Sequence, residues 1–389
     1  MPVRLGLERL LDGPDRKLIT GQRLGLVCNP ASIDSRIVHA SDRLGSGDWT
    51  LAALFGPQHG FRSDLQENMI ESPHAQDAKR RVPVHSLYSE TREPTAEMLA
   101  DIDVLVIDLQ DVGTRIYTYI YTMANCLRAA RRHGIRVVVC DRPNPINGND
   151  IEGAPLDPAY ASFVGQFAIP MRHGLTIGEA ARLFNDHFGL NAAVDVVPMD
   201  GWTRGMYYDD TGLPWVLPSP NLPTLDSAIV YPGGVLFEGT VLSEGRGTTR
   251  PFEIIGAPWI DGERFAEAMN RRQLPGVYFR PVFFEPTFHK QALKTCGGCQ
   301  VHVTDRATYR SMRAAVEMLE EFRKEAPAET LWRDPPYEYE TVKPPIDILY
   351  GSDRLRKGID AGEPAASIAS DWPAGEAAFR ELRRKHLLY

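Results

Sequence analysis

Residues 103–140 read DVLVIDLQDVGTRIYTYIYTMANCLRAARRHGIRVVVC, and this stretch decides the fold. Residues 103–109 and 136–140 are short, near-continuous apolar runs, which is typical of strands buried on both faces of a parallel sheet. Between them, residues 117–133 have the character of a long helix, and Gly134 supplies its C-terminal stop. The stretch therefore predicts a strand, a helix and a second strand of a doubly wound α/β domain.

The same alternation continues on both sides of this stretch. Similar apolar runs predict further strands at residues 23–28, 51–55, 84–87 and 194–199. Further helices are expected at residues 95–100 and 176–188. In the second of these, Thr176 is the expected N-cap, and Glu179 completes a capping box.

The second half of the chain has a different pattern. Residues 213–224 (LPWVLPSPNLPT) contain four prolines in twelve residues, so they can form neither a helix nor a central strand. We interpret them as an ordered connection, and we expect one domain over residues 1–227 and a smaller α+β domain over residues 228–389. In the second domain, strands are expected at 228–231, 277–284 and 300–303, and helices at 261–271, 307–326 and 376–389.

Composition excludes several classes of protein. The chain has 389 residues, of which 43% are hydrophobic and 24% charged, so it is not a disordered chain, a collagen or a coiled coil. Its net charge of −8 and the lack of a long basic cluster argue against a nucleic-acid partner. No apolar run approaches the roughly 18 residues of a membrane span. The amino terminus has no signal-peptide core, so the chain as written is expected to be cytoplasmic.

The five cysteines are too few and too scattered for a disulfide framework. Cys28 and Cys140 lie in apolar runs and are expected to be small buried hydrophobes. Cys296 and Cys299 form a CxxC pair, but no second pair completes a zinc site and no helix follows as in a thioredoxin motif. We expect these cysteines to be structural.

Polar loops follow three of the predicted strands. They are residues 56–62 (GPQHGFR), 110–115 (QDVGTR) and 141–145 (DRPNP). In an open parallel sheet, ligands bind beyond the carboxyl ends of the strands. Any one of these loops is explained as well by a helix cap or an ion pair, but together they favour a single binding cleft. A later glycine-rich loop, residues 238–249 (EGTVLSEGRGTT), is a candidate to join them.

Several common catalytic motifs are absent. The first strand is followed by NPAS rather than GxGxxG, and the chain has no P-loop, GxSxG or HExxH motif. The histidines are scattered, so we expect neither a metal nor a cofactor. The remaining chemistry is that of carboxylates, with Asp108, Asp111, Asp141 and Glu244 as candidates. Anion-binding groups are supplied by Arg62, Arg115, Arg142, Arg172 and Arg246, and stacking faces by Tyr117, Tyr119, Tyr121 and Trp215.

A larger set of motifs resembles one known family. The strings are FGPQHGFR, DLQDVGTRIYTY, CDRPNPING, SFVG, RHGLTIGE, LPWVLPSPNLPT, YPGGVLFEGT, SEGRGTTRPFE, CGGCQVHVTD and PPYEYE with PIDILYGSD. In this order, from about Leu24 to Tyr389, they resemble the exo-β-N-acetylmuramidases, which are peptidoglycan hexosaminidases. The resemblance implies a Rossmann-like, doubly wound, mostly parallel N-terminal domain, a smaller α+β domain and a cleft between them. It also implies removal of N-acetylmuramic acid from the non-reducing end of peptidoglycan fragments or muropeptides.

The resemblance also points to site residues. Catalytic candidates are Gln58, Asp111 and Glu244, and substrate-binding candidates are His59, Arg62, Arg115, Tyr119, Arg142, Asn144, Asn221 and Arg246. The family motif reads Gly-Pro-Glu-His-Gly, and its glutamate is the favoured catalytic group, whereas this chain has Gln58. Because an amide cannot transfer a proton at neutral pH, two hypotheses stay open. The chain is either an active exo-glycosidase or a catalytically weakened saccharide-binding relative on the same fold.

Overall fold

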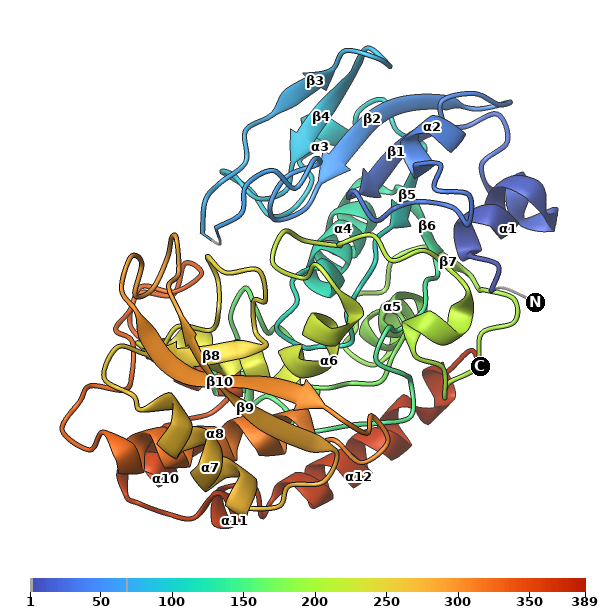
Figure 1. Cartoon of the computed structure of the whole chain (residues 1–389). Helices are drawn as coiled ribbons and strands as arrows, with labels where there is room; N and C mark the ends of the chain where they lie inside the picture. Colours follow the sequence, from blue (N-terminus) through green and yellow to red (C-terminus); the bar gives the residue numbers. More distant parts are fainter. Residues whose placement is uncertain (1–2, 68) are drawn as a thin grey trace.

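The structure, a computed structural model, describes residues 3–67 and 69–389, and within them the first half of the chain forms a seven-stranded sheet (Figure 1). The strands are β1 (Arg23–Cys28), β2 (Thr50–Gly56), β3 (Ala75–Asp77), β4 (Val82–Ser86), β5 (Val104–Asp108), β6 (Arg136–Cys140) and β7 (Val194–Val197). Their order is β3-β4-β2-β1-β5-β6-β7, and every neighbouring pair is parallel except β3 and β4. The predicted Rossmann-like α/β fold is confirmed.

Helices cover both faces of this sheet. They are α1 (Gly6–Asp12), α2 (Ala40–Arg43), α3 (Ala96–Leu99), α4 (Tyr119–His133) and α5 (Ile177–Asp186), with short 3-10 helices at Pro14–Leu18, Pro158–Tyr160 and Tyr208–Thr211. Successive side chains of a strand point to opposite faces. Leu105 and Ile107 of β5 therefore share a core with α4 and α5, while Val104 and Val106 share one with α1. Each strand is buried on both sides, which explains its continuous apolar run.

The ends of the two main helices form as the sequence predicts. Thr176 accepts a hydrogen bond from the Glu179 backbone, and the Glu179 side chain bonds back to the Thr176 backbone, which completes the capping box of α5. Gly134, with φ of 69°, ends α4 in the left-handed conformation that favours glycine.

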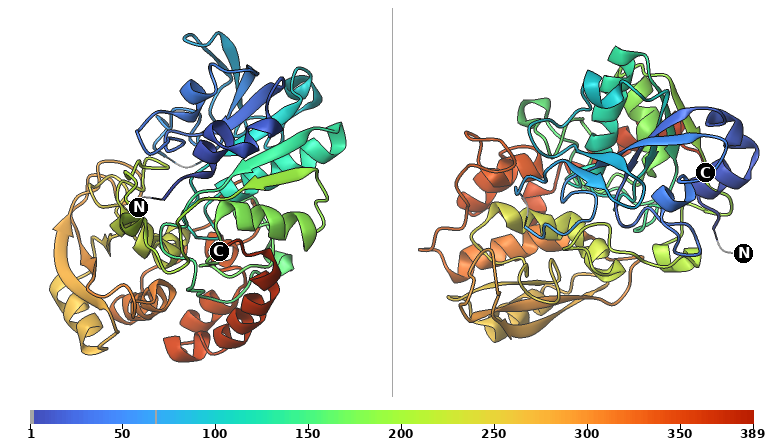
Figure 2. Two further views of the ribbon diagram at one scale, coloured as in Figure 1. Left: turned by 90° about the vertical axis from the view of Figure 1, so that its right-hand side faces the viewer. Right: turned by 90° about the horizontal axis from the view of Figure 1, so that it is seen from above.

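The second half contains a smaller antiparallel sheet packed against helices. The sheet has the order β8 (Ile254–Ala257), β10 (Cys296–Val303), β9 (Val277–Phe284). The helices are α6 (Leu225–Gly234), α7 (Gly262–Arg271), α8 (Ser311–Glu325), α9 (Pro345–Tyr350), α10 (Arg354–Asp360), α11 (Ala365–Ile368) and α12 (Trp372–Arg383), with short 3-10 helices at Val235–Gly239 and Arg384–His386. Two further views show this half packed along one side of the first (Figure 2).

One predicted strand is wrong. Residues 228–231 lie inside α6, because Thr224 caps a helix there by accepting a hydrogen bond from the Ser227 backbone. Periodicity alone cannot separate a short buried helix from a buried strand. The domain boundary that we placed between residues 227 and 228 falls within this helix, and the division stays a prediction. The C-terminal helix also begins earlier than expected, at Trp372.

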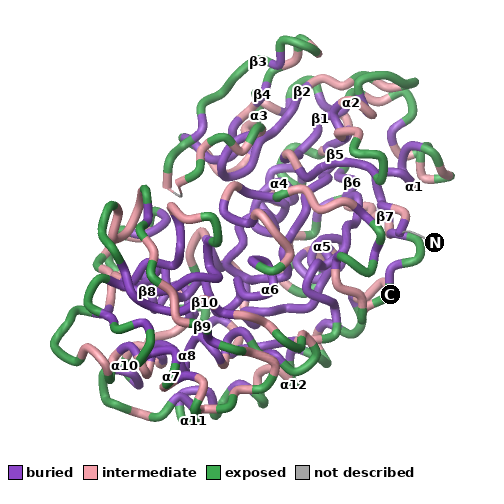
Figure 3. Tube along the Cα trace, in the orientation of Figure 1, coloured by how far each residue is buried: buried purple, intermediate pink, exposed green. Residues whose placement is uncertain are grey.

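A single core connects the two halves. Phe265 and Phe322 of the second half, stacked with ring centroids 4.0 Å apart, belong to the same buried cluster as Leu105 of β5. In Figure 3, buried chain is concentrated in the middle of the molecule, in both halves. The C-terminal segment then returns to the first half, where the Tyr389 hydroxyl donates to Asp141 Oδ2 at 2.7 Å. A pocket at this junction is therefore built from residues that are distant in sequence.

Within the described residues, none of the helices has both the length and the apolar character that crossing a membrane requires. All five cysteines are buried and free of disulfides. Cys296 and Cys299 lie inside β10 itself rather than before it, and burial raises the pKa of the Cys299 thiol.

Candidate active site

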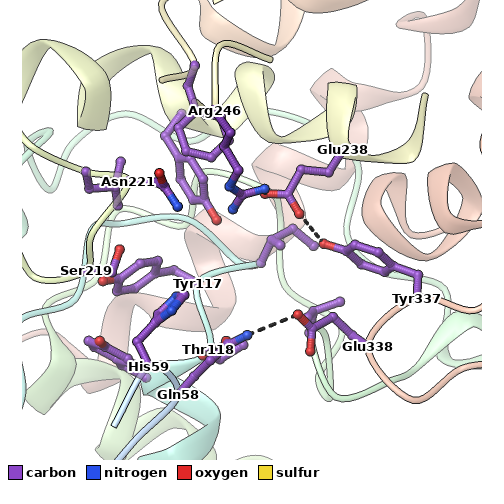
Figure 4. Close-up of a pocket in the computed structure, with 16 residues that line it drawn as sticks. Gln58, His59, Tyr117, Thr118, Ser219, Asn221, Glu238, Arg246, Tyr337 and Glu338 are labelled. Carbon is purple, nitrogen blue, oxygen red and sulfur yellow. Dashed lines mark hydrogen bonds and ion pairs between the residues drawn. The ribbon is translucent and has the colours of Figure 1, made fainter. Parts of the chain in front are cut away.

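A pocket opens at the junction of the two halves (Figure 4). Its polar lining consists of Gln58, His59, Thr118, Ser219, Asn221, Glu238, Arg246 and Glu338, together with Tyr117, Tyr119, Tyr231 and Tyr337. The first half contributes the loops that follow β2 and β5 and the proline-rich connection. The second half contributes α6, the glycine-rich loop and a turn near residue 338. Of the three predicted strand-end loops, only residues 56–62 contribute to the lining, together with the predicted glycine-rich loop. The lining residues after β5, 116–119, lie just beyond the predicted loop 110–115.

The loop after β2 makes a tight turn that presents Gln58 and His59. The Gly60 backbone N–H donates to the Pro57 carbonyl at 2.9 Å, and His59 and Gly60 have φ values of 70° and 79°. A Cβ on Gly56 would lie 2.5 Å from the Phe61 nitrogen, so only glycine fits where the strand ends. This turn directs residue 58 into the pocket.

The Gln58 amide has a defined orientation. The Thr118 hydroxyl donates to Gln58 Oε1 at 2.8 Å, so the other end of the amide, Nε2, is the donor. Nε2 donates to Glu338 Oε1 at 3.0 Å. Gln58 therefore connects the start of α4 to a carboxyl group that comes from the far end of the chain.

Glu338 lies in a strained turn. Tyr337 and Glu340 exchange two backbone hydrogen bonds of 2.9 Å, and the residues between them, Glu338 and Tyr339, have φ values of 45° and 69°. Two positive φ values in a two-residue hairpin turn normally require Asn or Gly. Non-glycine residues held in this region cost about 1–3 kcal/mol each, and such strain clusters at functional sites.

Burial and a neighbouring carboxylate change the acidity of Glu338. Burial raises its pKa, the Glu238 carboxylate raises it further, and hydrogen bonds from Tyr88 and Gln58 oppose the rise. The resulting pKa is about 7. A carboxyl group with this pKa can both give and take a proton near neutral pH.

His59 is neutral in this site. Burial and the positive charge of Arg246 lower its pKa to about 4, although a hydrogen bond with the Leu65 carbonyl opposes the change. That carbonyl lies 2.7 Å from Nδ1 and can only accept, so Nδ1 carries the proton. His59 Nε2 is therefore an acceptor rather than a donor.

Arg246 and Glu238 form the opposite wall. Arg246 Nη1 lies 2.8 Å from Glu238 Oε1, and the Tyr337 hydroxyl donates to Glu238 Oε2 at 2.6 Å. Behind Arg246, outside the lining, Glu244 is fully buried and pairs with Arg246 at 3.2 Å and Lys290 at 2.6 Å. Glu244 thus supports the guanidinium from the side away from the pocket.

Five predicted site residues lie in this lining: Gln58, His59, Tyr119, Asn221 and Arg246. Glu244 and five others do not, although they occupy the expected loops. Arg142 binds Asp108 through two hydrogen bonds of 2.6 and 2.7 Å. Arg115 donates to the carbonyls of Ala154, Ile169, Leu349 and Tyr350.

The remaining three also lie outside the lining. Asn144 donates to the Leu175 carbonyl at 2.9 Å. Asp111 Oδ2 accepts from the Gly113 backbone at 2.7 Å. Arg62 is exposed and lines a separate hollow beside the same loop. The predicted cleft is therefore smaller than expected, and the roles of these residues stay predictions.

Three important residues were not predicted: Thr118, Tyr337 and Glu338. Glu238 is the first residue of the glycine-rich loop that we named as a candidate, but Glu238 itself was not predicted as a site residue. Glu338 lies in the PPYEYE string, which carries the family resemblance yet follows no strand of the large sheet. The string itself was the only signal that could have identified it.

Within the described residues, no group of three or more His, Cys, Asp or Glu side chains is arranged to hold a metal ion. The polar groups that line the pocket are carboxyl, guanidinium, amide, imidazole, hydroxyl and phenol groups.

Comparison with known proteins identifies the family. The models for the N-terminal and C-terminal parts of the exo-β-N-acetylmuramidase NamZ match residues 24–226 and 229–389. This chain belongs to the NamZ family. The peptidoglycan β-N-acetylmuramidase NamZ of Bacillus subtilis strain 168 is 44% identical over 389 residues, which cover 100% of this chain and 91% of that protein. The family resemblance of the sequence motifs is confirmed.

Solved structures agree with this membership. A crystal structure of a DUF1343 family protein from Bacteroides fragilis NCTC 9343 has a TM-score of 0.90 and 35% identity, covering 100% of this chain and 99% of that one. A second DUF1343 family protein from the same organism has a TM-score of 0.79 and 28% identity, with the same coverage. Both structures share the fold of this chain over its whole length.

Proposed function

We propose that this chain is an exo-acting glycoside hydrolase that removes N-acetylmuramic acid from the non-reducing end of peptidoglycan fragments. Membership of the NamZ family supports the substrate class. The observation that carries the proposal is the buried carboxyl group of Glu338, which lies in the pocket with a pKa of about 7. Such a group supplies the proton transfer that glycosidic cleavage needs.

The remaining lining suits an anionic N-acetylated sugar. N-acetylmuramic acid carries a lactyl carboxylate, for which the Arg246 guanidinium is a suitable partner. Glu238, paired with that guanidinium, adds a second carboxyl group to the pocket. Positive charge develops on the sugar ring in the transition state, and a nearby carboxylate or the sugar's own acetamido group can stabilise it.

The alternative is a saccharide-binding relative with little turnover. It is favoured by Gln58, because an amide can hydrogen-bond a sugar but cannot protonate a leaving group. Under this alternative the pocket recognises the same saccharide and releases it unchanged. The two proposals therefore differ in turnover and not in ligand.

Two disaccharides separate these proposals. One is N-acetylmuramic acid β-1,4-linked to N-acetylglucosamine, and the other has the two sugars in reverse order. We expect the full chain to release free N-acetylmuramic acid from the first and nothing from the second, as measured by mass spectrometry. Calorimetric binding of the first disaccharide with no release would instead support the saccharide-binding relative.

A further inference from the structure

The amide at position 58 leaves the site without a proton donor at the family's favoured position, so another group must fill that role. Three other carboxyl groups come into question. Glu244 is fully buried behind Arg246, and Asp111 lies outside the lining. Glu238 lines the pocket, but it forms an ion pair with the Arg246 guanidinium at 2.8 Å, whereas the donors to Glu338 are a neutral amide and a neutral phenol. Glu338 is the group that remains.

The two oxygens of Glu338 are held by donors from separate elements of the first half. Gln58 Nε2, after β2, donates to Oε1 at 3.0 Å. The Tyr88 hydroxyl, after β4, donates to Oε2 at 2.8 Å. Because each carboxyl oxygen has two acceptor positions, both contacts leave room for a proton. The carboxyl group is thus oriented by the first half of the chain although the second half carries it.

The turn that carries Glu338 is clamped onto the first half. The Arg92 guanidinium lies 3.7 Å from the ring centroid of Tyr339, the other strained residue of the turn. Tyr339 also contacts the rings of Tyr88 and Phe163 at 5.8 and 6.1 Å between centroids. These contacts offset the cost of the left-handed backbone and fix where Glu338 points.

Several titratable or charged groups interact electrostatically with Glu338. They include Tyr88, Tyr231, Tyr337, Tyr339, Glu238 and Arg246. The pKa of each of these tyrosines is raised, so the four phenols are neutral near pH 7. Of the charged groups that act on the pKa of Glu338, Glu238 has a stronger effect than Arg246.

We infer that Glu338 is the general acid of this site and that Gln58 is the residue that positions it. The inference rests on the proposed function. Glu338 gives its proton to the glycosidic oxygen as the bond between that oxygen and C1 breaks, and the electron pair of the bond stays on the oxygen. Water supplies the hydroxyl group that C1 gains, and the remaining proton of that water returns to the Glu338 carboxylate.

Glu338→Gln tests the assignment with two leaving groups. On the disaccharide, whose leaving sugar needs a proton, we expect kcat/KM to fall by about 10²–10⁴-fold. On a 4-nitrophenyl muramide, whose leaving group departs as a stable anion, we expect a much smaller loss. Glu340→Gln is the matched control from the same turn. Its side chain accepts from the Val342 and Lys343 backbone, pairs with the Lys343 side chain at 3.8 Å and lies outside the pocket lining, so both rates should stay unchanged.

The outcomes separate the inference from the proposed function. If the wild type does not hydrolyse the disaccharide, the proposed function is wrong, and this inference, which rests on it, is wrong as well. Two results with an active wild type would show that Glu338 is not the general acid. In the first, kcat/KM of Glu338→Gln on the disaccharide stays within threefold of the wild-type value. In the second, kcat/KM falls by the same factor on the disaccharide and on the 4-nitrophenyl muramide.

The pH profile adds a second readout, which a merely structural role would not change. A general acid must be protonated, so kcat/KM of the wild type should fall as pH rises above about 7. Tyr88→Phe removes a hydrogen bond that favours the carboxylate, so the pKa of Glu338 should rise and the alkaline limb should move to higher pH. If the alkaline limb of Tyr88→Phe lies at the same pH as that of the wild type, the assignment is contradicted.

Gln58→Glu provides the sharpest contrast. The amide of Gln58 lies 3.0 Å from Glu338, so this variant places a second carboxyl group next to the first. Two carboxyl groups at such a distance share a proton, which raises the pKa of one of them. We expect the alkaline limb to move upward, with a gain in the optimal rate of less than about tenfold. A gain of about 10²-fold or more, the effect of one general acid, would assign the proton donor to position 58 and overturn the inference.

Discussion

Replacing Arg142 with methionine is expected to lower the free energy of unfolding by about 3–5 kcal/mol. Arg142 is 1% exposed and Asp108 is 0% exposed, and the guanidinium binds both carboxylate oxygens of Asp108. Arg142 also donates to the Ile33 carbonyl at 2.8 Å. Without Arg142, the negative charge of Asp108 is buried between β1 and β6 with no partner of opposite sign. Urea unfolding followed by circular dichroism measures the loss.

A matched control is Arg136→Met on the same strand, β6. Arg136 pairs with Asp195 at 2.7 Å, but both side chains are exposed, at 43% and 40%. We expect its removal to cost less than about 1 kcal/mol. The double variant Asp108→Leu with Arg142→Met should recover much of the loss, because no unpaired charge remains. Unchanged stability of Arg142→Met with a raised KM would show instead that Arg142 binds the sugar, as the motif first suggested.

The strands of the large sheet could be predicted because burial on both faces leaves a continuous apolar run in their sequence. Residues 104–108 and 136–140 are buried on both faces, so nearly every position is apolar. Residues 228–231 are equally apolar for a different reason, since they form a helix enclosed by the core of the second half. An apolar run indicates burial, and only the capping side chain at Thr224 indicates which element is buried.

The site could be predicted only in part, because the strand-end rule selects loops and not side chains. Gln58 and Arg142 both follow strands of the sheet. Gln58 faces the pocket, whereas the Arg142 guanidinium binds the buried Asp108 carboxylate. Glu338 could not be predicted from the sequence, for a different reason. It meets Gln58 across 280 residues of sequence, through a turn whose position depends on tertiary contacts with Tyr88 and Arg92.

Glu244→Gln is expected to cost about 3–5 kcal/mol of stability at pH 7, because it removes the carboxylate partner of the buried Lys290 and one of the two carboxylates that pair with Arg246. Lys290 lies 2.6 Å from Glu244 Oε2, and Arg246 lies 3.2 Å from Oε1. Burial opposes ionisation of Glu244, but Lys290, His289 and Arg246 outweigh it and hold the pKa well below its usual range. The exposed pair of Glu267 and Arg271 on α7 supplies the control, Glu267→Gln, for which we expect a change below about 0.5 kcal/mol.

The pH dependence of this loss has a defined sign. Since the pKa of Glu244 is lower in the folded state, its stabilisation is complete above the unfolded pKa of about 4.3 and is lost as pH falls through the folded pKa. The gap between wild type and Glu244→Gln should therefore stay constant from pH 7 to pH 5 and narrow only in more acidic solution. If Glu244 were the catalytic carboxyl group instead, Glu244→Gln would lower kcat by about 10²–10⁴-fold with stability unchanged. Because Glu244 lies behind Arg246 and out of the pocket, we expect the opposite pattern, in which stability falls and the alkaline limb of the kcat/KM profile stays near pH 7.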